Sequence, residues 1–501
     1  MKTKIIFAAI AAVMLSACNS EVEKPSIITG DSTPLNVAGS KAIGQNNRII
    51  YEMNIYSVSE EGTFKAAEQK LDELNSLGVD IVWLMPVYKR AGSNLMGDPS
   101  KPFKVVGSPY AISDFRALNP DFGTVSDMKQ FVDKAHSLGM KVWLDWVANH
   151  TSFDNVWMTS HPEFYVKDDE GKADIVRDIN GNEIYPDVYQ LDFQNPSLRS
   201  EMINSMKYWL NETGIDGFRF DYVSGWRILQ STFWQEVVDA LHKEKADIEL
   251  LAEADFTDSN CSKLVPLGFN YDYSWAMHTR MHELPKSESV ASLQNQAEGL
   301  YNTKLYDNMS RMSYVTNHDD YNDKEAYPAY YSNKLGEGNY ALCDVLTFTF
   351  YGMPLLYNGQ EIGYPRVISF FHKEPINWSA GDKRTTNTVS TLAYLRHTCP
   401  ALSDGNAEER AEMQMLQTNP SASSMAYIKK KGDQTMLVVL NFGKEQSVYV
   451  YQTPEGEYTQ VLDSRTIADG PSQRDVEIKG APKGVCEFPM ERKGYAIYIK
   501  K

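Results

Sequence analysis

The sequence predicts an α/β protein: a closed (β/α)8 barrel with a small subdomain inserted after strand 3, followed by a C-terminal all-β sandwich domain. Three observations support this fold class. Between about residues 45 and 400, short apolar segments alternate with amphipathic helical ones, as parallel strands covered by helices do. The helical period is lost over residues 150–190. After residue 400, short strands separated by turn residues replace the alternation.

The barrel prediction depends on a recurring unit of helix, glycine and strand. The first helix is expected to begin after the N-cap residue Thr63 and to end at Gly78, and the same transition recurs at Gly139 and Gly214. Eight strands are expected, in the segments 48–56, 79–87, 141–147, 214–223, 248–253, 269–275, 313–319 and 353–359. An open doubly wound sheet is the alternative, but no G-x-G-x-x-G motif follows the first strand.

Two further modules interrupt or follow the barrel of residues 45–400. Residues 150–190 contain an Asn-Gly turn between short extended pieces, which indicates a small irregular or β subdomain of the kind that shapes a binding cleft. Residues 401–501 are expected to form the sandwich domain. Its clearest strands are the segments 425–429, 434–441, 447–451 and 494–499.

The N-terminus has the pattern of a secretory signal. Two lysines precede an apolar run over residues 5–15, which is too short to span a membrane well, and small residues lead to Cys18. The sequence LSAC resembles the lipobox of bacterial lipoproteins, which implies a signal peptide at 1–18, lipidation of Cys18 and a polar tether at 19–44. We therefore expect an exported protein anchored by lipid to a bacterial membrane, with the outer membrane or cell surface favoured over the inner membrane.

Composition limits the partners. The formal net charge of −17 argues against nucleic acid, because phosphate binding needs a basic surface. Aromatic residues make up 12% of the chain, a supply that suits the flat apolar faces of sugars. The four cysteines beyond Cys18 are widely spaced, which predicts neither a disulfide framework nor a zinc site. We expect a monomer.

Polar residues collect at four of the expected strand ends. They are Asp145 with Asn149 and His150, Arg219 with Asp221, Glu253, and His318 with Asp319. Taken alone, the pair of Arg219 and Asp221 would be a structural ion pair. The carboxyl ends of barrel strands meet at one rim, however, and the active sites of such barrels lie there. Four such ends therefore predict a catalytic carboxylate cluster.

The chemistry that fits this cluster is cleavage of a glycosidic bond. That reaction needs one acid to protonate the leaving oxygen and one carboxylate to trap the oxocarbenium-like centre. Two carboxyl groups in different environments can supply both forms at one pH. Arg219 is expected to keep Asp221 ionised, as a nucleophile requires. No motif of a nucleophilic Ser or Cys, and no metal-triad spacing, points to another chemistry.

The ordered motifs resemble those of the α-amylase superfamily, glycoside hydrolase family 13. The matching segments are Asp145-Trp146-Val147-Ala148-Asn149-His150, Gly217-Phe218-Arg219-Phe220-Asp221, Leu250-Leu251-Ala252-Glu253-Ala254 and Asn317-His318-Asp319, with Gln190-Leu191-Asp192-Phe193 and Gly107-Ser108-Pro109-Tyr110 as weaker ones. Each motif is weak alone, and the set in family order is specific. The resemblance extends from about residue 45 to the C-terminus.

The resemblance implies a role for each matched residue. Asp221 would be the nucleophile, Glu253 the general acid and then base, and Asp319 the stabiliser of the transition state. The substrate-binding residues would be Tyr110, His150, Arg219 and His318. No cofactor is required for the chemistry, and a structural calcium ion is left open, with Asn149 as its one ligand by motif. Asp145 is expected to serve mainly as structural support.

Two departures from the family pattern stand out. Ser224-Gly225 occupies the positions where amylases often carry Lys-His, which helps to hold substrate and calcium. The loop over residues 57–63 lacks the aspartate-rich calcium motif of many bacterial relatives.

The preferred function is retaining hydrolysis of α-1,4-glucosidic bonds in starch-derived glucans or maltooligosaccharides. Two alternatives stay open. The first is a transglycosylase or an α-glucosidase acting on short α-glucosides with the same residues. The second is a non-catalytic glucan-binding protein, which the presence of all three carboxylates disfavours.

Overall fold

A computed structural model describes residues 22–28, 31–93, 95–287, 289–301, 309–320, 338–404, 410–479 and 484–501. The predicted signal peptide and the lipidation site at Cys18 lie outside these residues. Among the helices in the described residues, none combines the length and hydropathy needed to cross a membrane.

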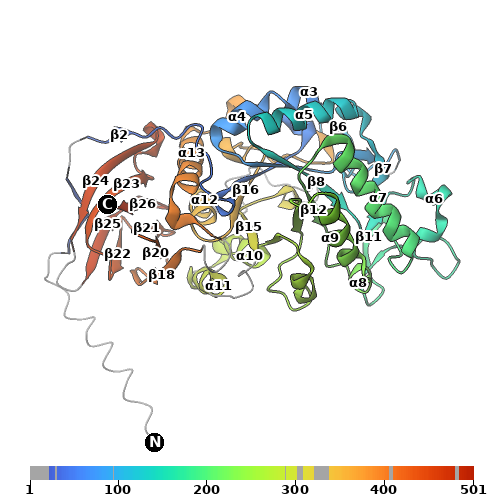
Figure 1. Cartoon of the computed structure of the whole chain (residues 1–501). Helices are drawn as coiled ribbons and strands as arrows, with labels where there is room; N and C mark the ends of the chain where they lie inside the picture. The colour runs from blue at the N-terminus through green and yellow to red at the C-terminus, as the bar shows by residue number, and fades with distance from the viewer. Residues whose placement is uncertain are drawn as a thin grey trace, which may run out of the picture.

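The predicted (β/α)8 barrel is confirmed. Eight parallel strands close on themselves in the order β12-β13-β14-β15-β16-β3-β4-β8. They are β3 (Ile50–Met53), β4 (Ile81–Leu84), β8 (Lys141–Val147), β12 (Gly217–Asp221), β13 (Glu249–Ala252), β14 (Tyr271–Tyr273), β15 (Ser310–Tyr314) and β16 (Met353–Tyr357). Each lies within or overlaps an expected segment, although β15 begins three residues before its segment. The barrel occupies the middle of the molecule (Figure 1).

Local signals place the ends of the helices that cover the barrel. Thr63 caps α3 (Phe64–Ala67) by accepting from the amide of Ala66, and Gly78 ends α4 (Lys70–Leu77) in the left-handed conformation. The expected single helix is therefore two short ones. The other long helices are α5 (Val125–Ser137), α7 (Pro196–Thr213), α9 (Phe233–Glu244), α10 (Trp275–His282), α11 (Ala291–Tyr301), α12 (Asn339–Thr349) and α13 (Lys383–Thr398).

The first strand is shorter than expected. Asn54 accepts a hydrogen bond from the amide of Tyr56 and so caps α2 (Ile55–Val58), which takes up the end of the predicted strand. An Asn side chain that bonds its own backbone two residues on favours a helix start over continued extension.

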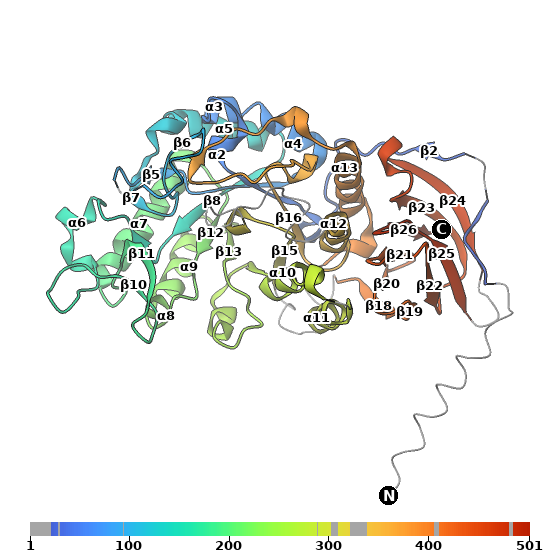
Figure 2. The same cartoon turned by 180° about the vertical axis from the view of Figure 1, so that it is seen from behind.

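The insertion after β8 forms the small β subdomain predicted from the loss of helical period. Its sheet has the order β10-β11-β9, with β9 (His150–Thr151), β10 (Ile175–Arg177) and β11 (Glu183–Gln190). Gly181 has φ +86°, so the Asn-Gly turn closes the β10–β11 hairpin as expected. The subdomain lies at the end of the molecule away from the C-terminal domain (Figures 1 and 2).

The C-terminal domain is the predicted sandwich of two antiparallel sheets. The larger runs β1-β24-β23-β26-β21-β20-β18, with β2 also on β24, and the smaller runs β19-β22-β25. These strands are β18 (Glu412–Leu416), β19 (Thr418–Asn419), β20 (Ser424–Lys431), β21 (Gln434–Asn441), β22 (Ser447–Tyr451), β23 (Gly456–Asp463), β24 (Ser472–Ile478), β25 (Val485–Pro489) and β26 (Tyr495–Lys500). Helices α12 and α13 lie between this domain and the barrel (Figures 1 and 2).

Part of the segment expected to be a tether is paired with this domain. Strands β1 (Ser26–Ile27) and β2 (Thr33–Pro34) both pair antiparallel with β24. The pairing uses backbone groups, so the polar composition of the segment gave no sign of it. Figure 1 shows this stretch, in dark blue, along the red sheet.

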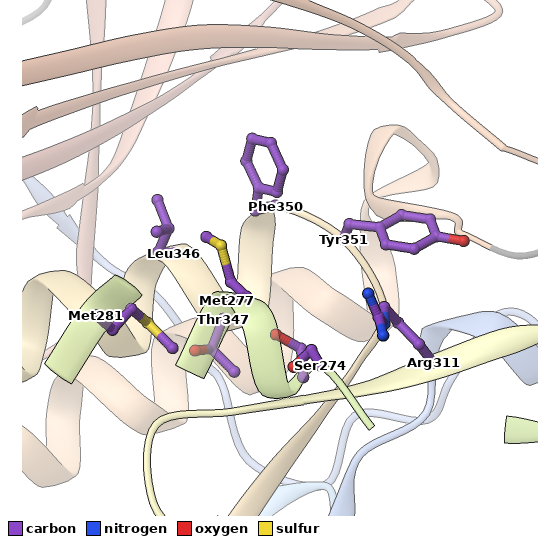
Figure 3. Close-up of a pocket in the computed structure, with 9 residues that line it drawn as sticks. Ser274, Met277, Met281, Arg311, Leu346, Thr347, Phe350 and Tyr351 are labelled. Carbon is purple, nitrogen blue, oxygen red and sulfur yellow. The ribbon is translucent and has the colours of Figure 1, made fainter. Parts of the chain in front are cut away.

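A small cavity lies between the barrel wall and α12. Met277 and Met281 of α10, together with Leu346 and Phe350, supply most of its apolar lining. Figure 3 shows Arg311 of β15 beside it. Because Arg311 pairs with Asp255 and Asp272, both at 3.0 Å, its charge is matched within the wall, and we assign the cavity no ligand.

Candidate active site

The barrel brings the four predicted strand ends to one rim. Asp145 lies in β8 beside Arg219 of β12, in parallel register. Asp221 ends β12, Glu253 directly follows β13, and Asp319 lies in the turn after β15. Close packing supports this arrangement at the base of β12. A methyl group on Gly217 would lie 2.3 Å from the carbonyl oxygen of Glu249, so only glycine fits there.

Arg219 joins three of the carboxylates. Its Nη1 lies 2.9 Å from Oδ1 of Asp145 and 3.1 Å from Oδ1 of Asp221, and its Nη2 lies 3.1 Å from Oε2 of Glu253. Its Nε donates to the hydroxyl of Tyr273 at 3.0 Å. The planar guanidinium group holds several acceptors in fixed directions, which a lysine cannot do.

Exposure separates Arg219 and Asp145 from the three predicted catalytic carboxylates. The side chains of Arg219 and Asp145 are 0% exposed. Those of Asp221 and Glu253 are each 13% exposed and that of Asp319 is 46% exposed. The fixed charges therefore lie beneath the surface of the site, and the three predicted catalytic carboxylates reach it.

Burial moves the pKa values of the two central carboxyl groups upward by different amounts. Burial is the largest cause at Asp221; it outweighs the opposing effect of Arg219 and raises the pKa to about 6. At Glu253 burial again dominates, and with the neighbouring Asp221 and Asp319 it raises the pKa to about 8. Arg219 thus opposes the rise at Asp221 without reversing it, which is a weaker effect than the sequence led us to expect.

A main-chain group also holds Glu253. The amide of Tyr222 donates to Oε2 of Glu253 over 2.6 Å. Tyr222 has φ +43°, in the left-handed region that a tyrosine seldom adopts. Since Oε2 accepts this bond and also faces Arg219, Oε1 is the oxygen left to carry the proton when Glu253 is protonated.

His318 is held by carboxylates on both sides. Its Nδ1 lies 2.5 Å from Oε1 of Glu52, and its Nε2 lies 3.2 Å from Oδ1 of Asp319. Although burial opposes the charge, these two carboxylates raise the pKa of His318 well above its usual value. An imidazolium therefore faces the substrate side of the site and neutralises part of the carboxylate charge.

Sequence reasoning missed Glu52 and Tyr273. Glu52 is fully buried in β3, and Tyr273 is fully buried in β14. A carboxylate within the apolar run of β3 was a signal that could have been used, because an unpaired buried charge is very costly. Tyr273 gave no comparable signal, since tyrosines are common in strands.

Tyr110 and His150 border the carboxylates. The hydroxyl of Tyr110 lies 3.0 Å from Oδ2 of Asp145 and 2.7 Å from Nε2 of His318, and the Tyr110 and His318 rings stack at 5.1 Å. Burial lowers the pKa of His150 to about 4, so this histidine is neutral, and it bonds the main chain of Tyr110. Tyr185 of the inserted subdomain lies 5.6 Å from the His150 ring and 5.9 Å from the Tyr222 ring.

The contacts of Asn149 give calcium no support. Within the described residues, its Oδ1 accepts from the side-chain Nε2 of Gln190 at 3.3 Å, and its Nδ2 is 3.3 Å from Nδ1 of His150. Calcium prefers six to eight oxygen ligands, usually with carboxylates among them. A methyl group on Gly225 would lie 2.9 Å from Oδ1 of Asn149, so the departure from the Lys-His pattern leaves space that Asn149 fills. Asn149 as a calcium ligand stays a prediction.

A closed barrel with paired carboxyl groups at its rim has the residues that a glycosidase needs. Comparison with known protein families agrees. The model described as "Alpha amylase, catalytic domain" matches residues 32–178 and 182–435, and "Alpha amylase, C-terminal all-beta domain" matches residues 417–485. The chain therefore belongs to the α-amylase family, glycoside hydrolase family 13, as its motifs predicted.

Individual relatives are distant. Alpha-amylase MalA of Haloarcula japonica is 27% identical over 413 residues, which are 79% of this chain and 55% of the relative. The oligo-1,6-glucosidase of Parageobacillus thermoglucosidasius is 30% identical over 204 residues, 35% of this chain and 34% of that enzyme. The chain thus spans about half or less of the length of these two relatives.

Among solved structures, the chain is similar to a maltogenic alpha-amylase, AmyB, from Thermotoga neapolitana. The TM-score is 0.73 at 24% identity, and the match covers 91% of this chain and 99% of AmyB. At this identity, the similarity supports the fold and no more.

Proposed function

We propose that this protein is a retaining glycoside hydrolase that cleaves α-1,4-glucosidic bonds in starch-derived glucans or maltooligosaccharides. The observation that carries the proposal is the sharing of one guanidinium group by Asp221 and Glu253, with the pKa of Asp221 at about 6 and that of Glu253 at about 8. Between these values Asp221 is mostly ionised and Glu253 mostly protonated, the combination that double displacement needs.

In the first step, the Glu253 proton passes to the glycosidic oxygen as the bond to the anomeric carbon breaks. The carboxylate of Asp221 attacks that carbon from the other face and forms a covalent glycosyl-enzyme. In the second step, ionised Glu253 takes a proton from water, the resulting oxygen attacks the anomeric carbon, and Asp221 leaves. The first step leaves Glu253 ionised and Asp221 esterified, and the second step returns both carboxyl groups to their starting states.

The remaining residues hold the sugar and the charge. Asp319, the most exposed of the three carboxylates, would accept hydrogen bonds from sugar hydroxyls as positive charge develops on the ring. Tyr110 would stack on the sugar, while neutral His150 and charged His318 would hydrogen-bond its hydroxyls. Arg219 would orient Asp221 and Glu253 together.

The test is the stereochemistry and size of the products from maltoheptaose. Proton NMR at early times should show the α-anomer first, and chromatography should show shorter maltooligosaccharides. A first product in the β-anomer would contradict retention. Longer products would favour the transglycosylase alternative, and release of glucose from isomaltose would favour an α-1,6 preference. Asp221→Asn should abolish turnover with the fold intact, and unchanged turnover would contradict the assignment.

Location and anchoring also belong to this proposal. The pattern at Cys18 supports export and lipid attachment at a bacterial surface, where the enzyme would meet extracellular glucans. Expressing cells fed labelled palmitate should incorporate label into the wild-type protein and not into the variant Cys18→Ser. Absence of label from the wild type, or equal label in both, would contradict a lipid anchor.

A further inference from the structure

A histidine pair lies behind the carboxylate rim. His278 and His282 are four residues apart on α10, so they project from one face of the helix. Their ring centroids are 4.1 Å apart. The methionines of the same helix, Met277 and Met281, point to the cavity beside α12 instead (Figure 3). The two imidazoles therefore lie together on the side of the helix that meets the turn after β15.

Asp320 completes the group from that turn. Its Oδ2 lies 3.1 Å from Nε2 of His278, and its Oδ1 lies 4.0 Å from Nδ1 of His282. One ligand atom from each of the three side chains lies within 4.8 Å of the others. In the part of the chain that the structure describes, this is the one group of three or more His, Cys, Asp or Glu side chains with such convergence.

We infer that His278, His282 and Asp320 form a binding site for one divalent transition-metal ion of the zinc type. Zinc binds histidine nitrogen and aspartate oxygen at about 2.0–2.2 Å, so the ligand atoms of a tetrahedral ion lie roughly 3.3–3.5 Å apart. The distances of 3.1 and 4.0 Å run to different oxygens of Asp320, and one ligand atom of each residue lies within 4.8 Å of the others, so the ligand atoms are near this separation without yet having it. Small movements of the side chains would close the site. Two imidazoles make calcium and magnesium, which prefer oxygen, unsuitable.

The tautomer of His282 supports metal ligation. Its Nε2 lies 2.9 Å from the carbonyl oxygen of Val315, which only accepts hydrogen bonds, so Nε2 carries the hydrogen. Nδ1 is then the atom turned toward Asp320. Metal-binding histidines typically donate their second ring N–H to a carbonyl or carboxylate in this way, which fixes the ring.

Packing also fixes His278. Its ring stacks on Tyr314 with 4.6 Å between centroids and meets the edge of Trp275 at 5.6 Å. Both histidines are thus held before any ion arrives, which lowers the entropic cost of binding. With three protein ligands, the site would keep a position for water or another ligand.

The site adjoins the carboxylate rim. Asp320 directly follows Asp319, and its Oδ2 accepts from the amide of Asn317 at 3.2 Å. A bound ion would therefore tie the turn at residues 317–320 to α10. The binding inference does not rest on the proposed function, whereas an effect on turnover through Asp319 does.

The first experiment is equilibrium dialysis of the untagged, chelator-treated full chain against Zn²⁺, with metal analysis. We expect one ion per chain at micromolar free zinc. His282→Gln should weaken binding at least tenfold. The matched control is His161→Gln, because His161 also pairs with a carboxylate, Glu163 at 3.1 Å, but has no second imidazole beside it. Absence of stoichiometric binding, or equal binding by both variants, would overturn the inference.

A second measurement needs no variant. The chain has nine histidines, so the ring nitrogens of ¹⁵N-histidine-labelled protein can be followed by NMR. Zinc should shift Nε2 of one histidine and Nδ1 of another, leaving the hydrogen on Nε2 of the second. Co²⁺ should give visible absorption bands that zinc removes. Shifts confined to exposed histidines would show surface binding and sink the proposal, whatever the turnover of the enzyme.

Discussion

The main-chain amide of Tyr222 donates to Oε2 of Glu253 over 2.6 Å, so the residue after the proposed nucleophile holds the proposed acid. The unusual φ of +43° at Tyr222 is what turns this amide toward β13. Backbone strain at such positions costs of order 1–3 kcal/mol and persists where the surroundings fix it. Here Arg219 fixes the same two carboxylates from below, so Asp221 and Glu253 are positioned as one unit.

The first prediction separates protonation from attack. Glu253→Gln cannot donate a proton, so hydrolysis of maltooligosaccharides should fall by about 10²–10⁴-fold, the usual size of general acid catalysis. α-Glucosyl fluoride needs little protonation of its leaving group, so its first step should fall far less. Pre-steady-state release of fluoride measures this difference.

Asp221→Asn is the matched control, because it removes attack and not protonation. It should lose activity on both substrates. If both variants lost activity equally on the fluoride, the assignment of Glu253 as the acid would be wrong.

The second prediction is a bell-shaped dependence of kcat/KM on pH. Asp221 must be ionised, so activity should rise through its pKa of about 6. Glu253 must be protonated, so activity should fall through its pKa of about 8. Initial rates from pH 4.5 to 9.5 check both limbs. In Glu253→Gln the alkaline limb should vanish from the residual activity, and a limb that stayed would have to come from another group.

The third prediction concerns stability and has a definite sign. Burial raises the pKa of Glu253 from its ordinary 4.5 to about 8. The folded state therefore holds this proton more tightly than the unfolded chain does. The stabilisation is complete below about pH 4.5 and is lost as the pH rises through about 8. An ionised Glu253 thus costs stability in alkaline solution.

Glu253→Gln should remove that cost. Relative to wild type, the free energy of unfolding of this variant should increase by at least about 1.4 kcal/mol from pH 5 to pH 9, the equivalent of one pKa unit. Its melting temperature relative to wild type should rise accordingly. Calorimetry at the two pH values measures it. Glu163→Gln, a change at a surface carboxylate, should show no such increase. A difference that stayed constant or fell with pH would contradict a raised pKa.

These predictions rest on a site that the sequence defined only in part. The strand ends were predictable because an apolar run that stops at a charged residue marks the point where a buried strand reaches the rim. Glu52 stood out as a charge within an apolar run, but its partner did not, since His318 is distant in sequence and becomes its neighbour only when the barrel closes. The same holds for Tyr273 and its partner Arg219. The same closure sets the pKa of Asp221, because burial depends on residues that no local pattern specifies.

The fold, too, was predictable from the sequence only in part. Near-continuous apolar segments predicted the barrel strands. The expected segment for β15 began too late, because its first two residues, Ser310 and Arg311, are polar. Arg311 can lie in the strand because Asp272 of the neighbouring strand matches its charge. Strands β23 and β24 carry many polar residues and were not foreseen. Their pairing with each other and with the N-terminal segment is made by backbone groups, which the sequence does not display.

The fourth prediction assigns Tyr185 to substrate binding. Its ring comes from the inserted subdomain and borders His150 and Tyr222, and it is 37% exposed. Tyr185→Ala should raise KM for maltoheptaose roughly tenfold, about 1.4 kcal/mol, with a smaller change in kcat. Tyr189→Ala, on the same strand but against Phe153, is the control. A loss confined to kcat would argue against a binding role.

The last prediction tests the packing that supports β12. A methyl group at Gly217 would lie 2.3 Å from the carbonyl oxygen of Glu249 and 2.6 Å from Cδ1 of Trp143, and the first is backbone that cannot rotate away. Gly217→Ala should therefore destabilise the barrel by about 1–3 kcal/mol or more and move Arg219 and Asp221 with the strand. The melting temperature and the turnover should fall together.

Gly299→Ala is the matched control for this change. Gly299 lies in α11 with no atom within 4 Å of the added methyl group, and alanine favours a helix over glycine by about 1 kcal/mol. This variant should melt at the same temperature or higher, with normal turnover. If Gly217→Ala behaved like Gly299→Ala, the contact between β12 and β13 would be looser than the 2.3 Å approach implies, and close packing would not be the reason for glycine at 217.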